Sequence, residues 1–206
     1  MQRLFHEIHR VLEKHIEKPH VEIEVRFGWK KDTYFDTNIQ REFYQNIYQH
    51  LDSPSFHKLE EQSGVYVWKN LRIVKMNGHI VSVHRKRLVE RVDLALEGTP
   101  YDIRLSVCQE IPVRYDATHL QHATLIRERS RTSFRYKMWS YDMTRVYIPR
   151  SDEHVYEFEI ELIPRMITTA VTMNYLAYSL ALKIRDVSLW SIDKCESPTL
   201  DAVSRI

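Results

Sequence analysis

Glycine and cysteine are both scarce in this chain, which has only 4 glycines and 2 cysteines among its 206 residues. Scarce glycine argues against the glycine-rich loops that hold phosphates in P-loop and dinucleotide-binding proteins, and neither motif occurs. Cys108 and Cys195 lie far apart without metal-ligand spacing, so we interpret them as reduced thiols of an intracellular protein. No apolar stretch approaches the roughly 20 residues that a membrane-spanning helix requires.

The chain also lacks a large excess of charge of either sign. The 30 basic and 28 acidic residues leave a net charge of +2, which argues against a strongly basic protein that coats nucleic acid. Residues 1–15 are rich in charge and have no apolar core, so we expect no signal peptide, no secretion and no membrane partner. The length suits a single domain over 1–206, which we expect in the cytoplasm, the nucleus or a virion.

Three segments show apolar residues at helical spacing. They are 3–17, which Pro19 terminates, 37–51 and 169–187. HEIH at 6–9 falls in the first helix and HLQH at 119–122 in an expected loop, and neither has the spacing of the H-E-x-x-H zinc motif. We therefore expect the helices to pack on a sheet rather than to bind a metal.

The remaining periodic segments predict β-strands. The candidates are 20–28, 65–75, 79–89, 101–111, 123–136, 138–148 and 154–163. The dipeptide NG at 77–78 is a strong signal for a hairpin turn, and EGTP at 97–100 predicts another turn.

Several of these strands carry like charges on one face. In VYEFEIEL (155–162) every second residue is a glutamate, and RERSR (127–131) places three arginines at the same spacing. An antiparallel sheet with one solvated face would explain simple alternation, but a solvated face usually mixes charges because neighbouring like charges repel. Faces of a single charge indicate a bound counter-charge, namely a cation for the glutamates and a polyanion for the arginines. Closing the strands into a barrel would bring both groups into one interior.

The stretch HRKRL (84–88) offers three adjacent basic residues. Because Val81 and Val83 share one face of the strand, Lys86 is predicted on the other face, although a bulge would reverse this choice between Lys86 and its neighbours Arg85 and Arg87.

Carboxylates and guanidiniums in one cavity point to phosphoryl chemistry. Carboxylate oxygens suit Mg²⁺ or Mn²⁺, which commonly bridge to substrate phosphates. Arginine binds phosphate through paired, charge-assisted hydrogen bonds. The sequence therefore indicates metal-assisted transfer or hydrolysis of a phosphate group.

The ordered motifs resemble those of a known family. E-x-E-x-R-F-G at 22–28 and E-x-E-x-E at 157–161 are joined by LRIV (71–74), YDIRLSVCQE (101–110), RERSRTS (127–133) and YDMTRV (141–146). The set resembles the metal-dependent mRNA 5′-triphosphatases of fungi, protists and large DNA viruses, which belong to the triphosphate tunnel metalloenzymes. The resemblance implies an α+β, mainly β, fold: a closed antiparallel eight-stranded β-barrel with a few helices packed outside. It implies removal of the γ-phosphate of nascent RNA, the first step of cap synthesis.

The resemblance also implies a role for each matching residue. Glu22, Glu24 and Glu161 would bind Mg²⁺ or Mn²⁺ with Glu159 close by, and Glu110 would position the attacking water. The phosphates would be held by Arg72, Lys86, Arg129 and Arg131. Supporting or substrate-side positions in the tunnel wall would be Arg104, Arg127, Asp142, Glu157 and Arg26. Asp142 also fits a turn or a helix cap, and that alternative stays open.

Two other functions remain open. One is a different tunnel enzyme, such as an inorganic tripolyphosphatase, a thiamine triphosphatase, a nucleoside triphosphatase or a class IV-type adenylate cyclase. The other is a catalytically silent anion-binding module. The main interpretation implies 5′-triphosphate RNA as substrate and a guanylyltransferase of the capping apparatus as partner, and leaves the oligomeric state open.

Overall fold

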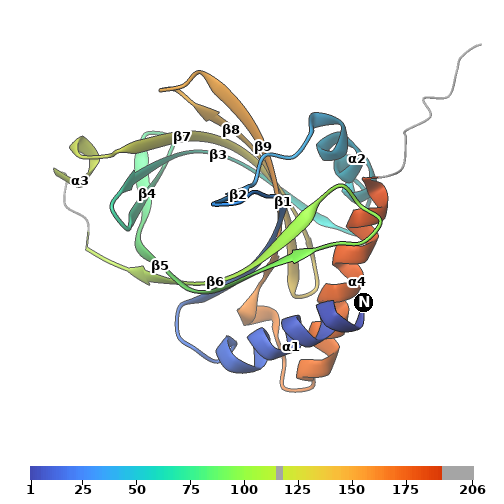
Figure 1. Ribbon diagram of the computed structural model, residues 1–206. Helices are drawn as coiled ribbons and strands as arrows, with labels where there is room; N and C mark the ends of the chain where they lie inside the picture. The colour runs from blue at the N-terminus through green and yellow to red at the C-terminus, as the bar shows by residue number, and fades with distance from the viewer. Residues whose placement is uncertain (115–117, 192–206) are drawn as a thin grey trace, which may run out of the picture.

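The computed structural model describes residues 1–114 and 118–191, so Cys195 lies outside the described part of the chain. Its centre is a closed antiparallel barrel whose strands follow the order β1-β6-β5-β4-β3-β7-β8-β9 and return to β1 (Figure 1). The strands are β1 (Val21–Lys30), β3 (His57–Trp68), β4 (Leu71–Met76), β5 (His79–Ala95), β6 (Asp102–Pro112), β7 (Leu125–Tyr136), β8 (Trp139–Ile148) and β9 (Glu153–Leu162). The short strand β2 (Phe35–Asp36) pairs with β1 outside the ring. The predicted closed eight-stranded barrel is confirmed.

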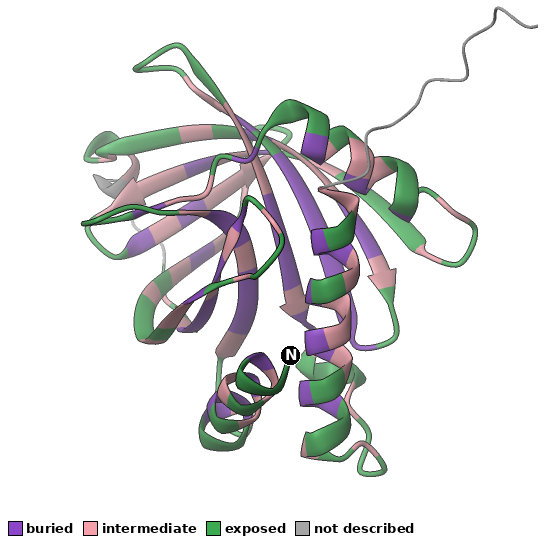
Figure 2. Cartoon of the chain, turned by 45° about the vertical axis from the view of Figure 1, so that its right-hand side comes forward, coloured by how far each residue is buried: buried purple, intermediate pink, exposed green. Residues whose placement is uncertain are grey.

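Helices cover one side of the barrel, as predicted. They are α1 (Gln2–His15), α2 (Arg41–Leu51) and α4 (Met173–Trp190). The short α3 (Thr118–Gln121) lies beside β3 on the other side of the barrel (Figure 1), and a 3₁₀ turn occupies Pro164–Met166. The hydrophobic core lies outside the barrel, where Phe27, Phe158 and Ile160 on the outer face of the strands meet the buried faces of the helices. Figure 2 shows buried and exposed residues alternating along α4 where it lies against the strands. A polar barrel interior is possible because apolar side chains of the strands point the other way.

The prediction of one strand over 65–75 is wrong, because that segment contains the end of β3, a turn at Lys69 and Asn70, and the start of β4. Residues 57–64, the first part of β3, were not predicted at all. Their outward residues are exposed and the inward residues Glu61 and Ser63 are polar, so no apolar alternation marks the strand. The expected loop around HLQH likewise contains the short helix α3.

Both predicted turns are present. Asn77 and Gly78 have positive φ angles of 49° and 80°, as the primed two-residue hairpin turn between β4 and β5 requires. The turn at Glu97 and Gly98 joins β5 to β6. At Gly28 the reason for glycine is space, because an added Cβ would lie 2.1 Å from the carbonyl oxygen of Asp36. Gly28 thus lets β2 lie close to the end of β1.

A bulge interrupts β5 after Lys86. The pairing with β6 shifts between Leu88 and Glu90, so Lys86 keeps its predicted inward direction. Beyond the bulge Glu90 points outward and meets α1. Its carboxylate accepts hydrogen bonds from Arg10 at 2.6 Å and Lys14 at 2.7 Å, and lies 2.7 Å from His15 Nε2. Glu90 therefore ties the first helix to the barrel.

Replacing Glu90 by glutamine should lower the stability of the protein by about 1 kcal/mol at pH 7. Lys14, His15 and Arg10 lower the pKa of Glu90 from 4.5 to about 2. Because a carboxyl with a lowered pKa stabilises the fold only when ionised, the difference between wild type and variant should hold above about pH 4.5 and disappear as the pH falls toward 2. Urea unfolding across this range measures it, with the exposed Glu17→Gln as control. A difference that persists unchanged at pH 2 would contradict this account.

No described helix is long and apolar enough to cross a membrane.

Candidate active site

The interior of the barrel, which we call the tunnel, brings the predicted site residues together from separate strands. Alternate residues of each strand point inward, so Glu22, Glu24 and Arg26 of β1 face the same space as three residues of β9. Glu24 is paired with Glu161 across the β1–β9 ladder, and Arg26 with Glu159. The last barrel pairing therefore joins two sequence motifs that lie more than a hundred residues apart in the chain.

A row of alternating charges runs across β1, β9, β8 and β7. Arg26 donates to Glu24 at 3.0 Å and to Glu159 at 2.8 Å. Arg131 of β7 donates to Glu159 at 2.5 Å and to Asp142 at 2.9 Å. Burial opposes the charge of Glu159, but Arg26 and Arg131 outweigh it and hold the pKa of Glu159 well below its usual range. Asp142 is thus part of the tunnel wall, in the middle of β8, rather than a turn or cap residue.

Glu161 differs from the other carboxylates of the cluster. Within the described part of the chain it has no ion pair and no hydrogen bond, and its neighbours include Asp142, Glu22 and Glu24. Burial and these like charges raise the pKa of Glu161 well above its usual range. Burial likewise raises the pKa of Glu24 to about 7, since Glu159 and Glu22 offset the effect of Arg26. The protein thus gathers more negative charge here than its own cations neutralise.

This surplus of carboxylates fits a divalent cation. Ligand atoms of Glu22, Glu24 and Cys108 all lie within 4.8 Å of one another, and Glu161 faces Glu24 from the next strand. Carboxylate oxygens are the ligands that hard cations prefer. Cys108 is a buried free thiol, and burial raises its pKa to about 11. The thiol therefore stays protonated, and the carboxylates are the suitable ligands for a hard cation in this cluster.

A second group lies on the β4–β5–β6 side of the tunnel. Lys86 contacts Glu22 and also lies 3.4 Å from Glu110, and Arg72 donates to Glu110 at 3.3 Å. Burial would raise the pKa of Glu110, but Lys86 and Arg72 lower it. The Glu110 carboxylate is therefore held ionised between two cations. Lys86 links this group to the carboxylate cluster.

Arg129 has spare hydrogen-bonding capacity in the tunnel. It donates to Ser63 at 3.0 Å and reaches Glu61 only at 3.5 Å, while its buried Nε has no partner in the described residues. Burial and the neighbouring guanidiniums of Arg131 and Arg72 lower the pKa of Arg129 to about 10. An unpaired donor among like charges is the arrangement expected where a polyanion binds.

The remaining predicted residues lie nearer one end of the tunnel. Arg127 donates to Glu157 at 2.7 Å, and Thr37 donates to the same carboxylate at 2.9 Å. Arg104 forms a two-pronged pair with Asp93 at 2.7 and 2.9 Å and lies 4.7 Å over the ring of Phe35. Arg127 and Arg104 are thus each tied to a carboxylate of the tunnel wall, by one and by two hydrogen bonds.

Sequence reasoning missed several residues of the tunnel. Glu61 and Ser63 lie in the unpredicted half of β3, and Asp93 lies beyond the predicted end of β5. Thr144 accepts a hydrogen bond from Arg131 at 2.9 Å. Only the inward parity of Asp142 could have indicated Thr144, because a threonine in a strand carries no other signal.

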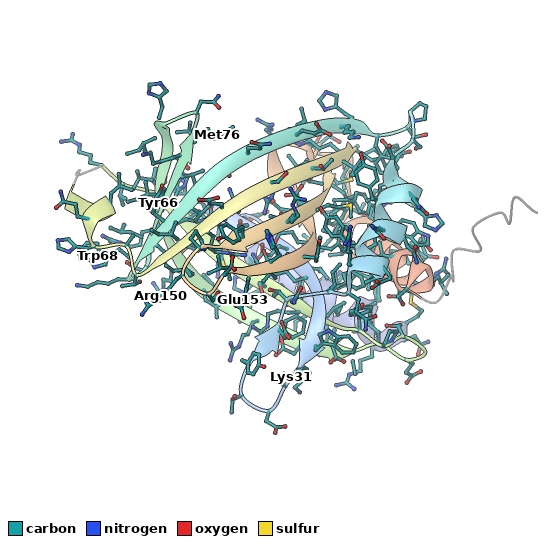
Figure 3. All side chains as sticks on the ribbon, turned by 90° about the horizontal axis from the view of Figure 1, so that it is seen from above. Lys31, Tyr66, Trp68, Met76, Arg150 and Glu153 are labelled. Carbon is teal, nitrogen blue, oxygen red and sulfur yellow. The ribbon has the colours of Figure 1, made fainter. Side chains whose placement is uncertain are left out.

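The tunnel opens where β1, β3 and β8 end and β4, β7 and β9 begin. Seen from above, Trp68, Arg150 and Glu153 lie away from helices α2 and α4, and Lys31 lies at the lower edge of the view (Figure 3). One cavity of the tunnel has a volume of about 230 Å³, and Arg26, Arg72, Lys86 and Arg127 line it together with apolar residues of β3, β4 and β7. This space suits a chain of phosphates that enters end-on.

Comparisons with known proteins give one family and a consistent fold. The family described as mRNA capping enzyme, beta chain, matches residues 2–175. The Pct1 RNA triphosphatase of S. pombe has 14% identity and a TM-score of 0.75, with 89% of this chain and 91% of that chain covered. Its complex with the Spt5 CTD gives 15% identity and a TM-score of 0.73 over 89% and 93% of the two chains.

A viral protein also shares the fold. The Mimivirus capping enzyme triphosphatase has 14% identity and a TM-score of 0.59, with 92% of this chain and 98% of that chain covered. No curated protein sequence matches significantly.

Proposed function

The chain belongs to the family of mRNA capping enzyme beta chains, and on this premise we propose that it is an RNA 5′-triphosphatase. The reaction is hydrolysis of the bond between the β- and γ-phosphates of nascent mRNA, which releases phosphate and leaves a diphosphate end. The observation that carries the proposal is the tunnel itself, in which the unpaired carboxylate of Glu161 and the unpaired Nε of Arg129 are enclosed together.

We propose that Glu22, Glu24 and Glu161 hold Mg²⁺ or Mn²⁺, with Glu159 beside them. The chemistry supplied by such a cation is polarisation of a terminal phosphate oxygen, which makes phosphorus more electrophilic. Glu159 is braced by Arg26 and Arg131, so it keeps the two basic residues in place as well as adding negative charge.

The other tunnel residues would bind substrate and water. Arg72, Lys86, Arg129 and Arg131 would hold the phosphates and offset the charge that develops in the transition state. Glu110, held ionised between Lys86 and Arg72, would orient the attacking water. The walls that fix these groups would be formed by the pairs of Arg127 with Glu157, Arg104 with Asp93 and Arg131 with Asp142.

A diphosphate RNA end is the substrate of guanylyl transfer in cap synthesis. We therefore propose a guanylyltransferase as the enzyme that uses the product. In the S. pombe relative a further partner is the Spt5 CTD.

The experiment that tests the function is phosphate release from RNA labelled at its γ-phosphate. We expect release with Mg²⁺ or Mn²⁺, no release with EDTA, and a diphosphate RNA end as product; an RNA with a 5′-monophosphate serves as control. Release from tripolyphosphate or ATP but not from RNA would assign the chain to another tunnel activity. Binding of Mn²⁺ without release from any of these substrates would make it a silent anion-binding protein.

A further inference from the structure

A second cavity adjoins the tunnel and bears no assigned role. We call it the vestibule. It has a volume of about 540 Å³ and shares the lining residues Leu125 and Arg127 with the cavity of the tunnel, so the two spaces are neighbours. One wall is the segment 34–38, and the opposite wall is formed by Leu125, Ile148 and Val155.

The lining of the vestibule is unlike that of the tunnel. Phe35, Leu125, Ile148 and Val155 give it an apolar wall, and Tyr34 stands at its rim with 59% of its surface exposed. Tripolyphosphate has no apolar surface to place against these side chains. A nucleoside has a flat base that packs on apolar and aromatic groups, and polar edges that can meet Asp36, Asn38 or Glu153.

Hydrogen bonds fix the segment 34–38 to the barrel. Asn38 N donates to Asp36 at 3.0 Å, and the side chain of Asn38 accepts a hydrogen bond from Tyr156 N at 3.0 Å. Thr37 donates to Glu157, which also binds Arg127. The wall of the vestibule is thereby connected to the wall of the tunnel, and a ligand would meet a preformed surface.

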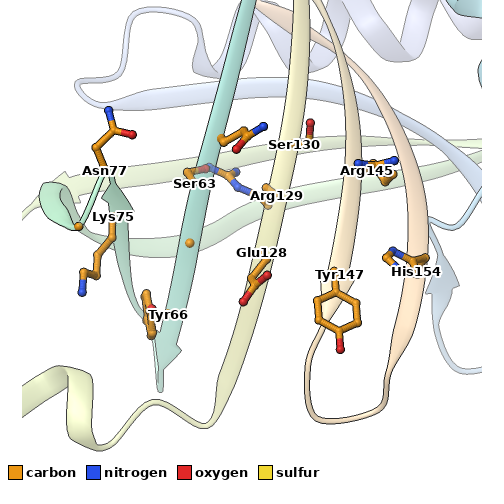
Figure 4. Close-up of a pocket in the computed structure, with 13 residues that line it drawn as sticks. Ser63, Tyr66, Lys75, Asn77, Glu128, Arg129, Ser130, Arg145, Tyr147 and His154 are labelled. Atoms are coloured by element: carbon orange, nitrogen blue, oxygen red, sulfur yellow. The ribbon is translucent and has the colours of Figure 1, made fainter.

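Another space adjoins the vestibule on the outside of the barrel. His154 lines the vestibule and also a groove of about 510 Å³ across the outer faces of β3, β4, β7 and β8 (Figure 4). We call this second space the outer groove. Its aromatic residues are Tyr66 and Tyr147, and the Tyr147 ring lies 5.0 Å from that of His154.

The outer groove also carries the basic side chains of Lys75 and Arg145, beside one carboxylate, that of Glu128 (Figure 4). Lys75 lies 5.7 Å over the ring of Tyr66, and Arg145 has no ion pair within the described residues. Arg145 also lines an adjoining cavity together with Arg41. Aromatic rings interleaved with basic groups are the surface that single-stranded nucleic acid recognises, by stacking of its bases and by phosphate contacts.

We propose that the vestibule binds the first nucleoside of the substrate RNA and that the outer groove binds the nucleotides that follow. This proposal rests on the proposed function, because the RNA chain is the occupant that is covalently attached to a triphosphate in the tunnel. Three ligands should then occupy different numbers of these spaces. Tripolyphosphate should occupy the tunnel, and ATP should occupy the tunnel and the vestibule. Triphosphate RNA should occupy the tunnel, the vestibule and the outer groove.

The test measures binding of a 3′-labelled triphosphate RNA by fluorescence anisotropy, with tripolyphosphate and ATP as competitors. In Tyr34→Ala we expect the affinity for RNA and for ATP to fall about tenfold, as for loss of one stacked base, and that for tripolyphosphate to change less than twofold. In Arg145→Ala we expect weaker binding of RNA alone, with a smaller dependence on salt. Tyr178→Ala and Arg3→Ala, two exposed residues of α4 and α1, are the matched controls.

Each half of the proposal can fail by itself. Equal losses of affinity for all three ligands in Tyr34→Ala would mean that the substitution distorts the tunnel. Unchanged affinity for RNA and ATP would mean that the vestibule does not bind the nucleoside. Unchanged RNA binding in Arg145→Ala would mean that the RNA chain does not bind in the outer groove. It would favour another occupant of the groove, such as an acidic peptide. Failure of the proposed function looks different, because then the wild-type protein would release no phosphate from RNA whatever these variants bind.

Discussion

Replacing Glu161 by glutamine should lower kcat at least about 100-fold and at the same time raise the stability of the metal-free protein. The loss of activity follows because a bound cation supplies several kcal/mol of transition-state stabilisation and Glu161 is one of the residues that would hold it; each 1.4 kcal/mol corresponds to a factor of about ten. The gain in stability follows because Glu161 is buried among like charges and forms no ion pair within the described chain. Glutamine keeps the shape of the side chain and removes the charge.

The two effects are measured separately. Phosphate release from triphosphate RNA gives kcat, and thermal unfolding in EDTA gives a stability that should rise by about 1 kcal/mol, or roughly 3 °C. Added Mn²⁺ should raise the unfolding temperature of wild type more than that of the variant. The control is Glu60→Gln, which removes an exposed carboxylate from β3. If the variant kept full activity, or were less stable than wild type in EDTA, the assignment of Glu161 as a metal ligand would be wrong.

The sequence predicts the tunnel well where a strand has one apolar and one charged face. Strands β1, β6 and β9 show clear alternation, interrupted at few positions such as Gln109 of β6, because their outer faces pack on helices while their inner faces hold charges. The alternation that defines these strands also identifies Glu22, Glu110 and Glu161 as inward residues. Here the fold and the candidate site come from the same pattern.

The prediction is poorest where no helix covers the barrel. In the first half of β3 both faces are polar or exposed, so nothing in the sequence distinguishes the strand from a loop. The prediction also could not supply partners across strands. That Arg131 reaches Glu159 while Arg129 is left with an unpaired Nε depends on register and side-chain direction, which alternation alone does not specify.

Replacing Arg131 by methionine should cost both activity and stability. Its guanidinium donates to Glu159, Asp142 and Thr144, so it neutralises two buried carboxylates of the tunnel wall. Loss of one partner from a buried ion-pair network costs about 3 kcal/mol, or on the order of 10 °C in unfolding temperature for a chain of this size. Loss of a preorganised charge near the phosphates should lower kcat about 100- to 1,000-fold.

A second substitution separates the two roles of Arg131. Glu159→Gln in the Arg131→Met background removes one carboxylate left without its partner, so much of the lost stability should return. Activity should not return, because no positive charge has been restored to the tunnel. Thermal unfolding and phosphate release on the single and double variants measure this. Recovery of turnover in the double variant would mean that Arg131 acts only by holding Glu159 and does not help to bind the phosphates.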